Sequence, residues 1–137
     1  MDRLGTDDIT RIARQGAAAL PCDDCAAFVC PGWESFPAAA SETTLQPLGT
    51  LWLPDDPEPT LEEYHPDGTR YWSPDAPIAL AFHPANRCSV WACKTCGRAF
   101  LRYTEYGGYY EDRRIRELNP ALIVAGVAGV AGVPGTA

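Results

Sequence analysis

The segment "SVWACKTCGRAF", residues 89–100, contains two cysteines in a C-x₂-C spacing, Cys93 and Cys96, with Gly97 directly after the second. A C-x₂-C turn places two sulfur atoms at a separation suited to one metal ion. The glycine permits the positive-φ backbone of a tight metal-binding turn. Beyond it, the alternation in "RAFLRYTEY", residues 98–106, predicts a strand. The segment therefore indicates half of a metal site, a redox-active dithiol, or a plain turn between strands.

A second pair with the same spacing, "CDDC", provides Cys22 and Cys25. Zinc binds four thiolate or imidazole ligands at the corners of a tetrahedron, so two such turns brought together complete its ligand shell. The sequence therefore predicts a structural Zn²⁺ site formed by Cys22, Cys25, Cys93 and Cys96. Because four thiolates leave no position on the metal for a water molecule, we expect the protein not to be an enzyme.

These residues resemble the metal-binding turns of a zinc ribbon. Cys93, Cys96 and Gly97 match the usual turn of that family, whereas "CDDC" matches only its cysteine spacing, because Ala26 takes the place of the glycine. The residues between the two pairs, 26–92, also exceed the spacing of the common form. The resemblance implies a small, mostly antiparallel β domain of zinc-ribbon type, with a long insertion between the turns.

Four other residues can replace one of these ligands: Cys30, Cys88, His65 and His83. Buried cysteines without a metal are common, and both histidines precede a proline, which favours turns. A redox-active dithiol is disfavoured, because the acids within "CDDC" would raise the pKa of a catalytic thiol and no helix pattern follows "CKTC". "PCDDC" fits half of a zinc-deaminase signature, but the H-x-E half is missing.

The chain has 137 residues, of which 46% are hydrophobic, with 13 prolines and 12 glycines. This composition predicts one small α+β domain with short elements and many loops, which benefits from a metal cross-link. We place this zinc-stabilised domain at residues 1–119. The apolar, glycine-rich residues 120–137 are expected to form a flexible tail, with a docked strand at 122–124 as the alternative. Their apolar run is too short to cross a bilayer.

The predicted elements follow from residue spacing and turn residues. Apolar residues from Ile9 to Leu20 recur at helical spacing, so we expect a helix that Thr6 caps and Pro21 ends. Strands are expected at 48–54 and 98–106, a hairpin at 61–72, and paired strands at 78–84 and 88–93. Residues 107–118 fit a strand and a short helix equally well.

The net charge of −7 is unevenly distributed along the chain. Residues 1–86 carry fourteen acidic side chains and four arginines, a net charge of −10, whereas residues 87–119 carry +3. The acidic part would repel phosphates, which argues against a nucleic-acid-binding surface there. Four basic residues can instead balance the negative charge of a four-cysteine site: Arg87, Lys94, Arg98 and Arg102. Because the N-terminus lacks an apolar secretory segment, we expect a cytoplasmic protein without a membrane partner.

The segment after the second turn, "FLRYTEYGGYYEDRRIREL", resembles small bacterial proteins of unassigned activity, some of which come from toxin–immunity loci. The likeness covers residues 91–118. It implies an acidic, non-enzymatic immunity protein whose loops mask the basic site of a toxin domain and whose charge accelerates association. Tyrosine and arginine, both frequent here, are also enriched at protein contacts. The alternative is a zinc ribbon that binds nucleic acid or acts in transcription through its arginine-rich second half.

Overall fold

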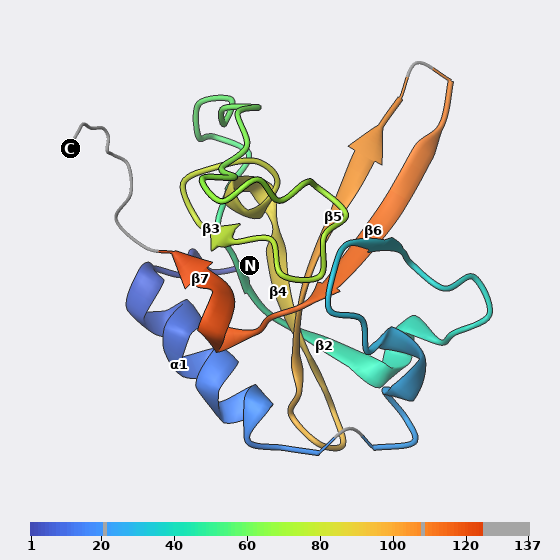
Figure 1. The fold of residues 1–137 in the computed structure, drawn as a ribbon. Coiled ribbons are helices and arrows are strands. Elements are labelled where there is room, and N and C mark those ends of the chain that lie inside the picture. Colours follow the sequence, from blue (N-terminus) through green and yellow to red (C-terminus); the bar gives the residue numbers. More distant parts are fainter. Residues whose placement is uncertain (21, 108, 125–137) are drawn as a thin grey trace.

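A computed structural model describes residues 1–20, 22–107 and 109–124 (Figure 1). One helix, α1, is followed by a five-stranded antiparallel sheet with strand order β1-β6-β5-β4-β2 and by a short parallel pair, β3 and β7. The bounds are α1 Thr6–Ala17, β1 Glu34–Ser35, β2 Leu45–Thr50, β3 Ile78–Ala79, β4 Ser89–Cys93, β5 Ala99–Tyr106, β6 Glu111–Glu117 and β7 Ile123–Val124. Four 3₁₀ turns lie at Ala26–Phe28, Glu42–Thr44, Ala85–Arg87 and Pro120–Leu122. The predicted α+β class is confirmed.

Strand β5 lies at the centre of the sheet and divides the core into two clusters. Its side chains alternate between faces as the sequence predicts, so Leu101 and Tyr103 enter one cluster and Phe100 enters the other. The first cluster packs the sheet against α1 and the loops around β3. The second contains three buried cysteines, Cys25, Cys30 and Cys93, together with Phe28 and Phe36. The cysteine turns are therefore part of the core.

Helix α1 packs on the face of the sheet that carries the first cluster, where Ile9 and Ala13 are buried with Val90 and Leu101. Near its C-terminal end the helix approaches the sheet closely. A Cβ atom at Gly16 would lie 2.8 Å from the backbone nitrogen of Ala99, so no larger residue fits there without a shift. This contact fixes the end of α1 beside the start of β5, and the chain then leads directly into the first cysteine pair.

The ends of α1 differ from the prediction. The N-cap is Gly5 rather than Thr6, because the carboxylate of Asp8 accepts a hydrogen bond from the Gly5 backbone N–H at 3.0 Å. This is the carboxylate half of a capping box. The helix ends at Ala17, so Leu20 is not on its buried face and is 86% exposed. The predicted stop at Pro21 falls outside the described residues.

Several predicted strands are shifted or paired differently. The strand expected at 48–54 is β2, which begins and ends earlier, and residues 61–72 form turns instead of a hairpin. Within 78–84 only β3 is extended, and it pairs with β7, whereas β4 pairs with β2 and β5. The strand expected at 98–106 is confirmed as β5. Residues 107–118, which left two options open, contain the strand β6.

The last described residues dock onto the domain. After the 3₁₀ turn Pro120–Leu122, β7 pairs in parallel with β3, with Ile123 opposite Ile78. A strand is thus present at the position given as the alternative to a tail, and residues 125–137 lie outside the described part. Within the described ranges, no helix has the length and apolar character needed to cross a membrane.

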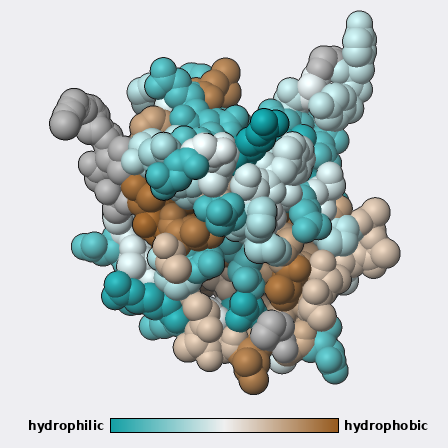
Figure 2. Space-filling model, viewed as in Figure 1, coloured by the Kyte–Doolittle hydropathy of each residue, from teal (hydrophilic) through white to brown (hydrophobic). Residues whose placement is uncertain are grey.

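On the side seen in Figure 1, the surface of the described residues is mixed in polarity. Apolar residues there form separate patches between hydrophilic ones (Figure 2). The β5–β6 hairpin projects from the body of the domain (Figure 1), and three tyrosines near its tip are exposed: Tyr106, Tyr109 and Tyr110. Exposed aromatic side chains on a projecting element are typical of contact surfaces.

Candidate metal centre

The second cysteine turn closes the β4–β5 hairpin. Cys93 is the last residue of β4, and its backbone N–H donates to the Arg98 carbonyl at 2.9 Å. The Gly97 N–H donates to the Cys93 carbonyl at 2.9 Å, and Gly97 has a φ of +84°. The predicted positive-φ turn is present. It holds the side chain of Cys96 on the same side as that of Cys93.

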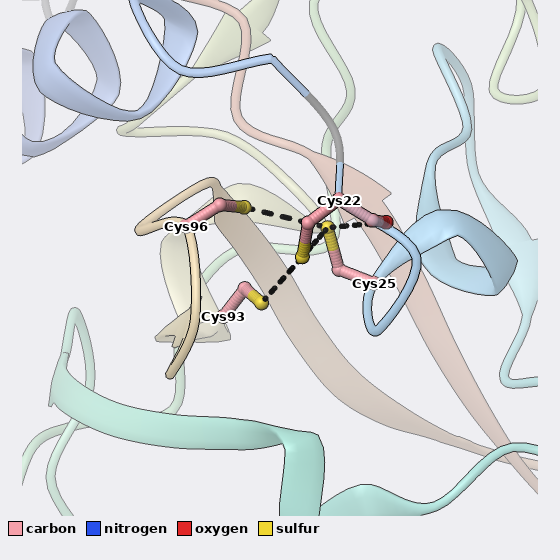
Figure 3. Close-up of side chains that lie close together, drawn as sticks. All are labelled: Cys22, Cys25, Cys93 and Cys96. Atoms are coloured by element: carbon pink, nitrogen blue, oxygen red, sulfur yellow. Dashed lines mark hydrogen bonds between the residues drawn. The ribbon is translucent and has the colours of Figure 1, made fainter.

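The first cysteine pair lies in the loop between α1 and the 3₁₀ turn Ala26–Phe28. Cys25 precedes this turn, and its carbonyl accepts a hydrogen bond from the Phe28 N–H at 2.9 Å. The loop brings Cys22 and Cys25 face to face with the β4–β5 turn, so that all four side chains point toward one another (Figure 3).

The four sulfur atoms lie at separations suited to a tetrahedral metal ion. Sγ–Sγ distances are 3.7 Å for Cys22 and Cys25, 3.6 Å for Cys22 and Cys93, and 3.5 Å for Cys25 and Cys96. All four lie within 4.8 Å of one another, and none is in a disulfide. Metal–sulfur bonds of about 2.3 Å in a tetrahedron imply sulfur–sulfur edges of about 3.8 Å. The four cysteines can therefore hold one metal ion.

Burial makes the thiolate form of the cluster unfavourable without a cation. Cys25 and Cys93 are almost fully buried, whereas Cys22 and Cys96 are partly exposed. Removal from water, together with the neighbouring thiols of Cys96 and Cys22, raises the pKa of the Cys25 thiol to about 12. A divalent cation reverses this preference, because it stabilises thiolates directly. Four thiolates form a closed shell, which is the arrangement of structural zinc sites rather than of catalytic ones.

Contacts outside the sulfur cluster hold the two turns together. The Thr95 hydroxyl donates to the Asp24 carboxylate at 2.6 Å, which joins the interiors of the two C-x₂-C turns. The Lys94 N–H donates to the Thr44 carbonyl at 2.9 Å, so the 3₁₀ turn before β2 also supports the second cysteine turn. Sequence reasoning missed these contacts, because they join positions far apart in the chain. The only signal in the sequence for the contact between Asp24 and Thr95 is that an acid and a hydroxyl residue occupy the same position within the two C-x₂-C turns.

Three of the four basic residues expected to balance the site have other partners. Arg98 donates to the Ala19 carbonyl at 2.6 Å and to Glu117 at 2.7 Å. The first of these hydrogen bonds links the residues just after α1 to the β4–β5 turn. Arg102 lies over the rings of Phe36 and Trp91. Arg87 donates to backbone carbonyls at 59 and 60. The fourth, Lys94, is exposed at the second turn.

The other candidate ligands lie outside the sulfur cluster. Cys30 is buried in the core, with its Sγ 3.3 Å from the Phe28 carbonyl, and Cys88 is fully buried, with its Sγ 3.1 Å from the Pro84 carbonyl. His65 bonds to Thr69 and Glu63. His83 is half-buried beside the Tyr103 ring, and its removal from water lowers its pKa. The structure brings together the four predicted cysteines and none of these replacements.

Cys30 and Cys88 are expected to resist alkylation in the folded protein. Burial raises the pKa of Cys30 to about 12 and also raises that of Cys88, so both thiols stay protonated at neutral and mildly alkaline pH. Since only the thiolate reacts, a shift of three pKa units predicts modification about a thousandfold slower than in denaturant. Mass spectrometry after a timed iodoacetamide pulse measures this difference. Equal labelling of Cys30 with and without denaturant would contradict its burial as a thiol.

Replacing Gly97 by alanine is expected to destabilise the metal-loaded domain by about 1–2 kcal/mol, the cost of a left-handed conformation for a residue with a Cβ. No atom lies within 4 Å of the added Cβ, so the cost comes from the backbone and not from a clash. Gly97→Asn is the matched control, because asparagine tolerates this conformation better. Urea unfolding compares the three proteins, and an alanine variant as stable as the wild type would show that the turn does not need its glycine.

No protein-family model, curated protein or solved structure matches this chain.

Proposed function

We propose that this protein is a non-enzymatic, zinc-stabilised binding module that uses an acidic surface to bind a basic protein partner, and that it is an immunity protein for a bacterial toxin. The observation that carries the structural role is the closed set of four cysteine sulfurs. It joins the loop after α1 to the β4–β5 hairpin, so a bound ion cross-links segments seventy residues apart. Such a site stabilises a small core without offering a position for substrate.

Zinc is the ion that we propose for this site. Tetrahedral sites made of four sulfurs select zinc or iron among the common metals. Zinc has no redox chemistry and no preferred geometry of its own, so it suits a site whose shape is set by two rigid turns. The link between Asp24 and Thr95 supports this structural role, because it holds the turns together independently of the metal.

The acidic surface supports the proposal of a basic partner. The segment from 55 to 75 has no helix or strand, and six of its acidic residues are exposed: Asp55, Glu58, Glu62, Glu63, Asp67 and Asp75. A concentration of like charge on exposed loops raises the association rate with a basic surface. The zinc–thiolate site would add further negative charge, since four thiolates exceed the charge of one divalent ion.

The arginines of the second half argue against the alternative nucleic-acid function. Arg102 and Arg113 both contact Glu42, and Arg114 pairs with Asp112 and Glu105. The fully buried Arg116 donates to the Ala76 carbonyl at 2.6 Å and to other loop carbonyls, and Arg98 pairs with Glu117. Because these guanidinium groups are engaged within the domain, they do not form the free basic stripe that phosphate binding needs.

Chromatography and binding kinetics test the proposal. At physiological ionic strength the protein should pass through a heparin column, and a toxin domain identified from the genes next to its own should be basic and should bind it, with an association rate that falls as salt rises. Reversing three exposed loop acids to lysine should lower that rate about tenfold or more. The loop variant carries lysine at Asp55, Glu58 and Glu62, and the matched control carries it at Asp2, Asp7 and Glu34. Retention on heparin without toxin binding would contradict the proposal and favour the nucleic-acid alternative.

A further inference from the structure

The outer half of β5 has an open side. β5 extends to Tyr106, but its neighbour β4 begins at Ser89, which lies opposite Arg102. Before Ser89 the chain leaves the sheet through the 3₁₀ turn Ala85–Arg87. The side chain of Arg87 holds this turn away from β5, because it donates hydrogen bonds to the backbone carbonyls of residues 59 and 60. Over the residues that the structure describes, no strand accompanies β5 beyond Arg102 on this side.

The hydrogen-bond pattern shows which backbone groups face the open side. The Arg98 carbonyl accepts from Cys93 on the β4 side, and the Ala99 carbonyl accepts from Leu118 on the β6 side. Successive residues of a strand alternate between its two neighbours. The N–H and C=O groups of Thr104 and Tyr106 therefore point to the β4 side. No described residue forms a hydrogen bond with these four groups.

The two edge strands of the sheet, β1 and β2, are protected against pairing, whereas the open side of β5 is not. β1 consists of only two residues. β2 contains Pro47 and a register shift, and Asp2 and Leu4 form backbone hydrogen bonds with Thr50 at its end. Short strands, proline, bulges and covering segments are the usual protections against unwanted strand pairing. The open part of β5 presents the backbone groups of Thr104 and Tyr106, which have high strand propensity and no charge, and its one charged residue is Glu105 between them.

A groove runs beside this open edge. Its volume is about 660 Å³, within the range of binding sites for small ligands and side chains. Thr104 and Tyr106 line it together with Trp52, Leu53 and Pro54. The lining also includes two arginines that have acidic partners: Arg102 pairs with Glu42, and Arg87 lies 4.0 Å from Glu58, whose side chain is 81% exposed. The edge thus has both backbone partners for a strand and apolar room for its side chains.

We propose that the groove between β5 and the 52–58 segment binds an extended segment of a basic partner protein, which adds a strand to β5 at Thr104 and Tyr106. Alternate side chains of that segment would enter the groove against Trp52 and Leu53, and a lysine or arginine would reach Glu58. This inference rests on the proposed protein-binding function and assigns it a docking surface.

Charge favours a basic partner over a second copy of this chain. Pairing two copies edge to edge would bring together two molecules that each carry a net charge of −7. It would also place Glu105 and Glu111 of both hairpins close to one another, because these residues flank Thr104 and Tyr106 in the β5–β6 ladder. Like charges at that distance oppose association.

A substitution at Thr104 tests the inference with little disturbance of the fold. Thr104→Pro removes the N–H that points to the open side, whereas the neighbouring β5–β6 hydrogen bonds are made by Tyr103 and Glu105. Thr104→Val keeps the N–H and is the matched control. The probe is a phage-displayed library of random peptides, selected against the full metal-loaded chain. The selected peptides are then measured by calorimetry against the wild type and both variants.

Peptides that use the edge should bind Thr104→Pro about tenfold or more weakly and Thr104→Val within about threefold of the wild type. They should also slow amide hydrogen exchange at Thr104 and Tyr106 in the wild-type protein, a readout that does not depend on the folding of any variant. The inference would be overturned if no peptide is selected, or if the peptides bind Thr104→Pro as tightly as the wild type. It would also be overturned by unchanged hydrogen exchange at Thr104 and Tyr106, or by a wild-type dimer that Thr104→Pro abolishes. If the selected peptides depend on the open part of β5 but are acidic, strand addition at this edge is supported and the basic partner is contradicted. If a toxin domain binds Thr104→Pro as tightly as the wild type, strand addition at this edge is contradicted and the proposed function stays intact.

Discussion

Replacing Cys25 with serine is expected to abolish stoichiometric zinc binding and to unfold the domain at neutral pH. Cys25 is fully buried, and its sulfur lies within 3.7 Å of those of Cys22 and Cys96. A neutral serine hydroxyl cannot replace a thiolate on zinc. Structural zinc contributes about 10–16 kcal/mol of apparent binding free energy at neutral pH, which is comparable to the whole stability of a typical domain, roughly 5–15 kcal/mol.

Cys88→Ala is the matched control for this loss. Cys88 is as deeply buried as Cys25, but its sulfur contacts the Pro84 carbonyl instead of the cluster. Removal of one buried sulfur should lower the free energy of unfolding by about 1–3 kcal/mol and leave the zinc content unchanged. Circular dichroism and elemental analysis of both variants measure the two effects. If Cys25→Ser folds as stably as Cys88→Ala and keeps its metal, Cys25 is not a ligand.

Truncation of Phe100 to alanine is expected to lower the free energy of unfolding by about 3–5 kcal/mol, the usual cost of deleting a fully buried phenylalanine. Phe100 is 0% exposed, at the centre of β5, and belongs to the same core cluster as Cys25 and Cys93. Its ring meets that of Phe28 edge to face, with centroids 6.2 Å apart. Because every sulfur ligand stays in place, the folded variant should still bind one metal ion.

Tyr106→Ala provides the control on the same strand. Tyr106 lies on the same face of β5 but is 71% exposed, so its loss should change the stability by no more than about 0.5 kcal/mol. Urea unfolding of the metal-loaded proteins compares the two variants. Similar losses at both positions would mean that β5 does not place Phe100 in the core and Tyr106 in solvent, which would overturn the burial assigned to the two ends of this face.

The parts of the molecule that depend on local sequence were predictable. Each C-x₂-C turn is encoded within four residues, and the alternation around Phe100 and Leu101 identifies β5 without knowledge of the rest of the chain. Gly97 could be expected to have a positive φ for the same reason. The fold class then followed from one helical pattern and several strand patterns.

The parts that depend on long-range contacts were not predictable. β3 and β7 pair only because the segments around 78 and 123 meet on the folded domain, and each is two residues long. Residues 61–72 have the turn chemistry of a hairpin, but no partner strand forms there, since tertiary contacts determine strand pairing. The cap at Gly5 was missed because Asp8 supplies the bonding group from inside the helix. The bridge from Asp24 to Thr95 likewise requires the two turns to be placed first.

Elemental analysis combined with X-ray absorption at the metal edge, on protein purified without chelators, tests the metal centre most directly. We expect one zinc ion per chain, coordinated by four sulfur atoms at about 2.3 Å. A folded protein without bound metal, or with a metal whose ligands include oxygen or nitrogen in place of a cysteine sulfur, would contradict the four-cysteine structural zinc site.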